Sequence, residues 1–224
     1  RAGLKDLRHT TLNMPSWLET KSPFLFQDLL LPKQIISSIE KVSLQANPPH
    51  LLISGPTGVG KTAIWRLIAR QVLGPSYKST THVLNAKDLS RTSGAMGKFE
   101  SFLRPEGTTS EDTLAGRTSL DAYDSSLVKV RDDKGPPAGF ESQKTSQSTP
   151  ISRIIVIEDA DYLGNIRQSY LRRMMEKSSI SARFIFTTTT PSRLIEALRS
   201  RTQHIRVPRT NRQDVESLLN KISE

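Results

Sequence analysis

A glycine-rich segment between an apolar run and a helical pattern holds the residues best suited to bind phosphate. Residues 55–62 match the phosphate-binding pattern G-x-x-x-x-G-K-[ST]. Glycines let successive backbone N–H groups turn into one hollow, and the positive end of the following helix faces the same hollow. Lys61 is expected to reach the β- and γ-phosphates of a nucleotide, and Thr62 to ligate Mg²⁺.

The whole segment is therefore predicted to bind the phosphates of a nucleotide. Its members are Gly55, Pro56, Thr57, Gly58, Val59, Gly60, Lys61 and Thr62. The alternative is a chance match in a glycine-rich turn. The apolar residues 51–53 before the loop and the helical pattern 63–69 after it argue against chance, because a phosphate loop joins a strand to a helix.

Two acids follow a second apolar run. Residues 153–157 are mostly branched apolar side chains, and Glu158 and Asp159 come directly after them. Transfer of a phosphoryl group to water needs Mg²⁺ and an oriented water molecule. One acid can hold the metal together with Thr62, and the second can orient the water. The alternative for such a pair is a helix cap or a solvated loop.

Strands and helices must alternate to position these groups. The pattern predicts strands over 51–54, 82–86, 153–157, 183–189 and 203–207. Helices are expected over 34–45, 63–73, 93–103, 165–177 and 191–198, with a last one after 211. The fold class is therefore α/β, a five-stranded parallel sheet with helices on both faces. Ligands bind at the carboxyl ends of such strands, where the glycine-rich loop, the acid pair and Thr189 all fall.

Composition narrows the class of protein. The chain has 224 residues, a net charge of +10 and no cysteine, which excludes disulfides and cysteine zinc sites. Residues 161–212 carry eleven Lys and Arg against three Asp and Glu. This excess favours a polyanion or an acidic protein as partner, or is a solvated basic surface without a partner. No apolar run approaches the about 18 residues of a membrane span. The sequence begins with Arg1 and not with methionine. We therefore expect a fragment or a processed chain, from which an N-terminal targeting signal cannot be identified.

Five short segments recur in an order typical of one family. They are Trp17-Leu18-Glu19-Thr20-Lys21-Ser22-Pro23, Pro49-His50-Leu51-Leu52, Asn85-Ala86-Lys87-Asp88, Leu171-Arg172-Arg173-Met174-Met175-Glu176 and the stretch 192–202, which ends in Ser-Arg-Thr. In this order they resemble the AAA+ ATPase module of eukaryotic and archaeal sliding-clamp loaders, the replication factor C family. The resemblance extends over residues 17–219 and is interrupted at 104–150.

The resemblance implies a role for each matching position. Glu158 falls where the family has its metal-site Asp, and Asp159 where it has its water-activating Glu. Thr189 occupies the position of the sensor Asn, and Arg201 that of the arginine finger that reaches the ATP of a neighbouring subunit. Three helix residues are assigned to the subunit boundary and to DNA: Arg167, Arg172 and Arg173.

It also implies partners and a domain organisation. We expect other clamp-loader subunits, a sliding clamp, DNA held by its phosphates and a nuclear location, with no membrane. Residues 1–33 form a lead-in, 34–207 the nucleotide-binding domain and 208–224 the start of a helical lid, whose remainder and collar are missing. Residues 104–150, rich in Gly, Ser, Thr, Asp and Pro, are predicted to be a largely disordered insertion with one strand-like patch at 127–130.

Three departures from the family pattern bear on activity. The acid pair is inverted, the sensor position holds Thr189 and the residue after the finger is Thr202. Asp159 is one methylene shorter than Glu, and a displacement of about 1 Å can cost about 10²-fold in rate. We therefore expect secure ATP binding and slow or absent hydrolysis. Two hypotheses stay open, an ATPase subunit that loads a ring clamp on DNA and a non-hydrolysing, nucleotide-bound scaffold.

Two helix faces carry further expectations. Met96, Phe99, Phe102 and Leu103 form either a clamp-contacting surface or simply a core face. In the helix 165–177, Ile166 falls on the apolar half of the wheel and Gln168 on the polar half.

Overall fold

The structure is a computed structural model that describes residues 22–103, 135–141, 151–178 and 180–223. Five strands form one sheet in the order β2-β3-β4-β1-β5, and every neighbouring pair is parallel. The strands are β1 (His50–Ser54), β2 (Thr81–Asn85), β3 (Arg153–Glu158), β4 (Ala182–Thr188) and β5 (Thr202–Arg206).

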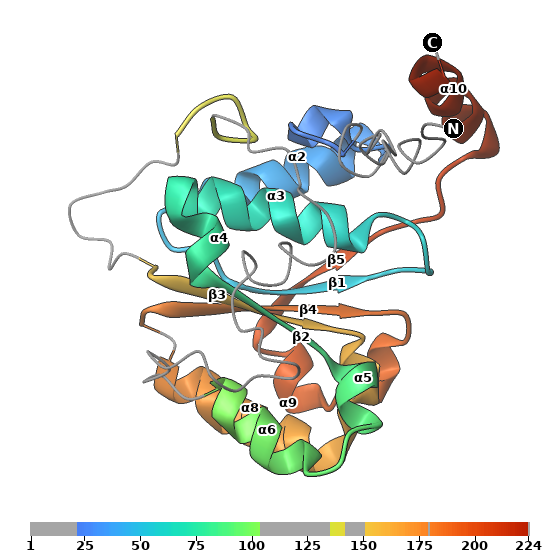
Figure 1. The fold of residues 1–224 in the computed structure, drawn as a ribbon. Coiled ribbons are helices and arrows are strands. Elements are labelled where there is room, and N and C mark those ends of the chain that lie inside the picture. The colour runs from blue at the N-terminus through green and yellow to red at the C-terminus, as the bar shows by residue number, and fades with distance from the viewer. Residues whose placement is uncertain (1–21, 104–134, 142–150, 179, 224) are drawn as a thin grey trace, which may run out of the picture.

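Helices cover both faces of this sheet (Figure 1). One face carries α2 (Lys33–Ser43), α3 (Lys61–Leu73) and α4 (Tyr77–Thr80). The other carries α5 (Ala86–Ser90), α6 (Ala95–Leu103), α8 (Gly164–Ser178) and α9 (Glu196–Arg199). Short 3-10 turns are η1 (Phe26–Asp28), η2 (Gly74–Ser76), η3 (Ala160–Tyr162) and η4 (Pro191–Arg193). The last helix, α10 (Arg212–Ser223), stands apart from the sheet.

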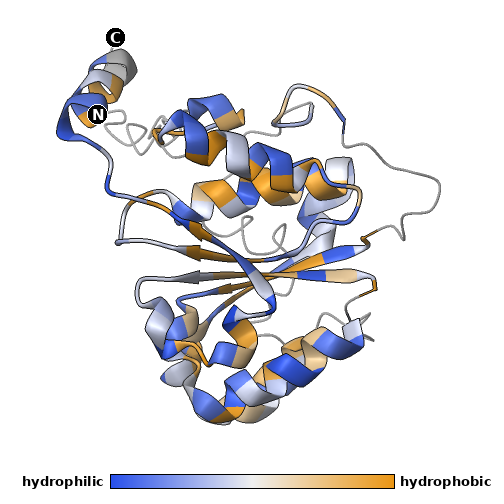
Figure 2. Cartoon of the chain, turned by 180° about the vertical axis from the view of Figure 1, so that it is seen from behind, coloured by the Kyte–Doolittle hydropathy of each residue, from blue (hydrophilic) through white to orange (hydrophobic). Residues whose placement is uncertain are grey.

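Alternate residues of each central strand enter two separate cores. Leu51 and Ile53 of β1 pack with the α2 and α3 side, whereas Leu52 packs with the α6 and α8 side. The strands are therefore apolar without alternation, as strands covered on both faces are. Figure 2 shows hydrophobic colour along the strands and much hydrophilic colour on the outer helices.

The predicted fold class is confirmed, but one predicted helix is wrong. Residues 191–198 form η4 and α9, with an extended break at Leu194 and Ile195. The cause is Gln168, which is 1% exposed and not on the polar surface as predicted. Its carboxamide donates to the Arg193 carbonyl at 3.1 Å and accepts from the Ile195 N–H at 2.7 Å. The extended backbone thereby satisfies a buried amide that a continuous helix would leave unpaired.

A second expectation, for helix α8, is also wrong. Ile166, predicted on the apolar half of α8, is 79% exposed, because it lies on the helix face opposite the buried Gln168, Leu171 and Met175. On α6 the core alternative is the one observed. Phe99, Phe102 and Leu103 are buried against α8 and the sheet, and Met96 is half-buried.

Part of the predicted insertion has a defined place. Residues 135–141 form a turn on the outer side of α3, where Gln71 accepts from the Ala138 N–H at 2.8 Å and donates to the Phe140 carbonyl at 3.1 Å. The remainder of 104–150, with the strand-like patch at 127–130, lies outside the described residues, as does most of the predicted lead-in. Among the helices described, none combines the length and apolar character that a membrane crossing requires.

Candidate functional site

The glycine-rich loop leaves the carboxyl end of β1 and enters α3. Gly58 and Gly60 have φ angles of 84° and 88°, in the left-handed region that glycine adopts without strain. No side chain caps the start of α3. The N–H groups of its first turn therefore remain available to a ligand in the loop. An anion in the loop would receive these donors together with the positive end of a 13-residue helix.

Lys61 is folded back onto the loop. Its Nζ donates to the carbonyl oxygens of Gly55 and Pro56, both at 2.8 Å. Burial lowers the pKa of Lys61, and the neighbouring carboxylates of Asp159, Asp161 and Glu158 oppose that shift. A bound phosphate would offer this cation an anionic partner in place of two carbonyl dipoles.

Glu158, the last residue of β3, reaches across to α3. Its Oε1 accepts from Thr62 Oγ1 at 2.8 Å and from Trp65 Nε1 at 2.9 Å. The structure therefore joins the two predicted metal ligands, although they lie 96 residues apart in the chain.

Asp159 adopts an unusual backbone conformation. Its φ of 51° is the only positive φ of a non-glycine residue in the described part of the chain. Its N–H donates to Thr187 Oγ1 and its carboxylate accepts from Asn85 Nδ2, both at 3.3 Å. Left-handed Asp is tolerated more readily than most residues but still has to be held in place. These contacts fix the second acid of the pair at the sheet edge.

Thr189 lies just beyond β4 and approaches a third acid. Its Oγ1 donates to Asp161 Oδ2 at 3.4 Å, and Thr188 Oγ1 donates to Asp161 Oδ1 at 2.7 Å. Asp161 had no predicted role, nor had Thr187. Their signals were the acid-Ala-acid spacing after β3 and the run of four threonines after Phe186.

A pocket of about 360 Å³ gathers most of the predicted residues at this edge. Its lining residues are Thr57, Gly58, Gly60, Lys61, Thr62, Glu158, Asp159, Thr187 and Thr189. Gly55, Pro56 and Val59 belong to the loop without lining the pocket. The donors present fit Mg²⁺, which takes one or two protein oxygens and completes its octahedron with phosphate and water. Thr62 and Glu158 would supply those oxygens, and the ion would neutralise charge developing on the transferred phosphoryl group.

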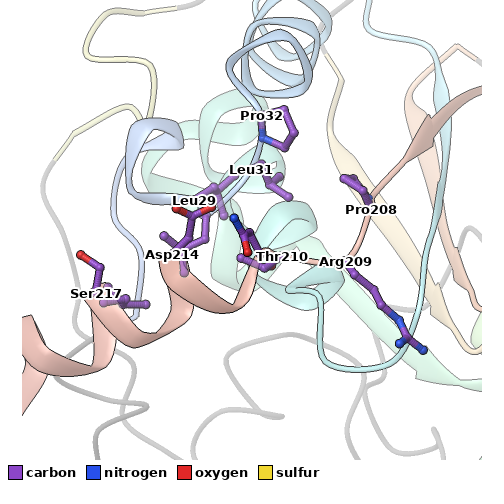
Figure 3. A pocket seen from close by; sticks show the side chains of 11 residues that line it. Leu29, Leu31, Pro32, Pro208, Arg209, Thr210, Asp214 and Ser217 are labelled. Carbon is purple, nitrogen blue, oxygen red and sulfur yellow. The ribbon is translucent and has the colours of Figure 1, made fainter.

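A second pocket, of about 450 Å³, opens between the segment before α2 and the start of α10 (Figure 3). Leu29, Leu31 and Pro32 form one wall, and Pro208, Thr210 and Asp214 the other. Val207, next to Pro208, donates its N–H to the carbonyl of Ser54 at 2.7 Å. Because the phosphate loop follows Ser54, the wall that contains Pro208 begins beside the start of that loop.

Arg201 lies at the amino-terminal ends of the strands, whereas the phosphate pocket lies at their carboxyl ends. It precedes β5, whose Thr202 pairs with His50 at the beginning of β1, whereas the loop follows Ser54 at the end of β1. Five strand residues at about 3.3 Å each separate the two edges by about 16 Å. Arg201 forms an ion pair with Glu176 of α8 at 2.7 Å.

The three predicted interface arginines line α8 but make separate contacts. Arg172 Nε lies 3.7 Å from the Glu176 carboxylate, which it shares with Arg201. Arg173 stacks its guanidinium on the Tyr170 ring at 5.6 Å, and Arg167 donates to the Leu163 carbonyl at 3.0 Å. None of the three lines the phosphate pocket.

A model of the ATPase family associated with various cellular activities, AAA, matches residues 51–209. The chain belongs to the AAA family. It is similar to a probable replication factor C subunit 2 of Dictyostelium discoideum, 27% identical over 92% of this chain and 50% of the relative. It is also similar to the replication factor C small subunit of Aeropyrum pernix, 26% identical over 93% of this chain and 52% of that protein.

Solved structures confirm the AAA fold. A form of RuvB from Thermotoga maritima superposes with a TM-score of 0.57 at 14% identity, over 89% of this chain and 53% of that one. The predicted resemblance is thus confirmed: the chain is an AAA+ module of the replication factor C-like kind. It spans about half the length of the curated relatives that it matches.

The close approach of the loop to the end of β5 gives a test of the site's framework. A Cβ on Gly55 would lie 2.4 Å from the Val207 carbonyl oxygen. We expect Gly55→Ala to lower the free energy of unfolding in urea by about 1–3 kcal/mol, the usual cost of overpacking. Gly97→Ala is the matched control, because nothing lies within 4 Å of its Cβ position on α6. It should raise stability slightly, and equal effects of the two substitutions would contradict the steric account.

Proposed function

We propose that this AAA+ module is the ATP-binding part of a subunit in a clamp-loader-like complex, which opens a ring-shaped sliding clamp and loads it on DNA. The observation that carries the proposal is the pocket at the carboxyl edge of the sheet. There the loop around Lys61 faces Glu158, Asp159 and Thr189, in a chain whose relatives are replication factor C subunits. The ATP-bound state would hold neighbouring subunits in the arrangement that grips the clamp.

The pocket beside α10 is proposed to take the base and ribose. The phosphate loop fixes one end of the nucleotide, and the chain from Val207 into Pro208 leads from that end to the second pocket. Its wall of leucine and proline suits the flat faces of a purine, and Asp214 and Thr210 supply polar groups. In this proposal the start of the helical lid, predicted from the sequence over residues 208–224, would lie beside the base.

Slow hydrolysis is proposed from the geometry of the acid pair. Asp159 holds a strained backbone and its carboxylate binds Asn85, while Thr189 is engaged with Asp161. Each of these side chains is shorter than its counterpart in the family and is already paired with a neighbour. The shorter Asp159 side chain would hold its carboxylate farther from an attacking water than a Glu would, which adds to the barrier for hydrolysis.

Arg201 is proposed to act on the ATP of a neighbouring subunit. About 16 Å of strand separates it from the pocket of its own chain, which is beyond the reach of an arginine side chain. The guanidinium is exposed, and among the described residues it is held by Glu176 and the Ala197 carbonyl. An exposed pair of this kind exchanges readily for a stronger anionic partner such as a γ-phosphate.

The basic last third is proposed to face DNA. Arg167, Arg172 and Arg173 lie along α8, and contacts of such side chains with phosphate are independent of base sequence. With DNA and the clamp as partners, we infer a nuclear location and service in replication or in the response to DNA damage. A second candidate, a non-hydrolysing scaffold locked with nucleotide, is favoured by the paired states of Asp159 and Thr189.

Loss of the loop lysine should remove ATP binding. Lys61→Ala deletes the charge nearest the phosphates, and we expect the dissociation constant for ATP, measured by calorimetry, to rise about 100-fold or more. Lys98→Ala removes an exposed lysine of α6 and should leave ATP affinity unchanged. Unchanged ATP affinity in Lys61→Ala would refute the assignment of the loop.

Single-turnover hydrolysis in the assembled complex separates the two candidates. We expect a slow but measurable rate that disappears in Asp159→Asn, because the amide cannot accept a proton from water. Asparagine tolerates the left-handed conformation of this position, so the backbone should be retained. Glu196→Gln, at an exposed acid of α9, is the control. Absence of any rate in the unsubstituted complex would favour the scaffold.

Replacement of the proposed finger should act on the complex and not on this chain. Arg201→Ala should lower ATP turnover by the assembled complex by about 10³-fold at the site it serves. ATP binding by this chain should be unaffected. Loss of the exposed pair with Glu176 should cost at most about 1 kcal/mol of stability. Arg199→Ala, two residues away on α9, is the matched control, and equal turnover of the two complexes would remove the role in trans.

A further inference from the structure

A buried tryptophan touches the acid that is proposed to hold Mg²⁺. Trp65 lies on α3, one turn after Thr62, and its side chain is 0% exposed. Its indole Nε1 donates to Glu158 Oε1 at 2.9 Å. Thr62 Oγ1 donates to the same oxygen at 2.8 Å. Because residues three apart share a helix face, two donors of one helix converge on a single carboxylate oxygen.

The indole is a donor held in one direction. Its ring is enclosed in the core between α3 and the sheet, and the Arg66 guanidinium lies 5.2 Å from the ring centroid. A buried indole N–H has no acceptor function and needs a partner, so Trp65 and Glu158 satisfy each other. Packing thus fixes the N–H, and the N–H fixes the orientation of the carboxylate.

The two oxygens of Glu158 consequently differ. Oε1 receives both donors, whereas Oε2 accepts no hydrogen bond from the described residues. Glu158 also lines the phosphate pocket. One oxygen is therefore anchored to α3 and the other is available to a ligand in the pocket.

We propose that Trp65 is a positioning residue that orients Glu158 toward the Mg²⁺ of the bound nucleotide. The inference rests on the proposed function, because it requires Mg²⁺ and ATP in this pocket. Glutamate has one more rotatable bond than aspartate, and its carboxylate loses more rotamer freedom when it is fixed. The indole N–H removes that freedom before the ion arrives. Partners that orient a metal ligand in this way contribute about 10- to 100-fold to metal affinity.

The test is Trp65→Phe, which keeps an aromatic ring in the core and deletes the N–H. ATP binding is measured by calorimetry in EDTA and over a series of Mg²⁺ concentrations. We expect the Mg²⁺ concentration for half-maximal enhancement of ATP binding to rise about 10-fold. Affinity for ATP in EDTA should not change. Leu67→Val is the matched control, because it loses buried volume on the same helix and Leu67 has no group that could donate to Glu158. Its Mg²⁺ dependence should equal that of the unsubstituted chain.

A double substitution locates the effect at the carboxylate. In a Glu158→Ala chain, the further change Trp65→Phe should leave the Mg²⁺ dependence where Glu158→Ala alone has set it. An additional shift in the double variant would overturn the inference, because the indole would then act through some other group.

A second readout does not depend on the folding of any Trp65 variant. The chain has two tryptophans, so Trp17→Phe leaves Trp65 as the sole indole emitter. Addition of Mg²⁺ to this protein with ATP already bound should change the emission of Trp65. Constant emission during Mg²⁺ binding that calorimetry detects would overturn the inference.

The outcomes distinguish this inference from the proposed function. An unsubstituted chain that binds no ATP would overturn both. A chain that binds ATP with Mg²⁺ but shows the same Mg²⁺ dependence after Trp65→Phe would overturn only the role of Trp65. Equal losses of ATP affinity with and without Mg²⁺ would show that the ring serves packing alone, and would overturn it as well.

Discussion

Parallel pairing of β4 with both β1 and β3 brings the ends of three strands to one edge of the sheet. Ser54 pairs with Thr188, and Ile157 pairs with Phe186, so the residues that follow each strand emerge side by side. The phosphate loop lies more than 90 residues before the acid pair in the sequence, and Thr189 comes later still. These segments meet only because of this strand register. A slip of one residue in the pairing of β3 with β4 would turn Glu158 to the other face of the sheet, away from α3.

At the carboxyl ends of the strands, hydrogen bonds within the protein keep the ammonium group of Lys61 apart from the neighbouring carboxylates. Lys61 binds the carbonyls of its own loop, and Glu158, Asp159 and Asp161 are each occupied by a hydroxyl, an amide or an indole. Lysine and acids are therefore near neighbours without forming a direct ion pair in the described structure. A polyphosphate with Mg²⁺ has a charge pattern complementary to this arrangement, because its anion suits the lysine and its cation suits the acids.

The sequence was sufficient for the sheet and the loop because their signals are local. A strand covered on both faces is continuously apolar, and a phosphate loop needs glycines at fixed spacing. It was insufficient where long-range contacts override the local pattern. Gln168 is polar yet buried, because the extended backbone at Arg193 and Ile195 satisfies its amide. Trp65 resembled any core residue of α3, and only the meeting of α3 with β3 reveals its bond to Glu158.

The positions of the pocket and of Arg201 at opposite edges follow from the same parallel topology. A residue that precedes β5 is as far from the phosphate loop as the length of β1 requires, whatever its side chain. A finger at this position is useful only to a molecule that presents its own carboxyl edge to it. Under the proposed function, one chain would contribute to two nucleotide sites, with its loop at one and Arg201 at the other. A change at Asp159 or Thr189 would then alter the first site without disturbing the second, because no described contact joins Arg201 to either residue.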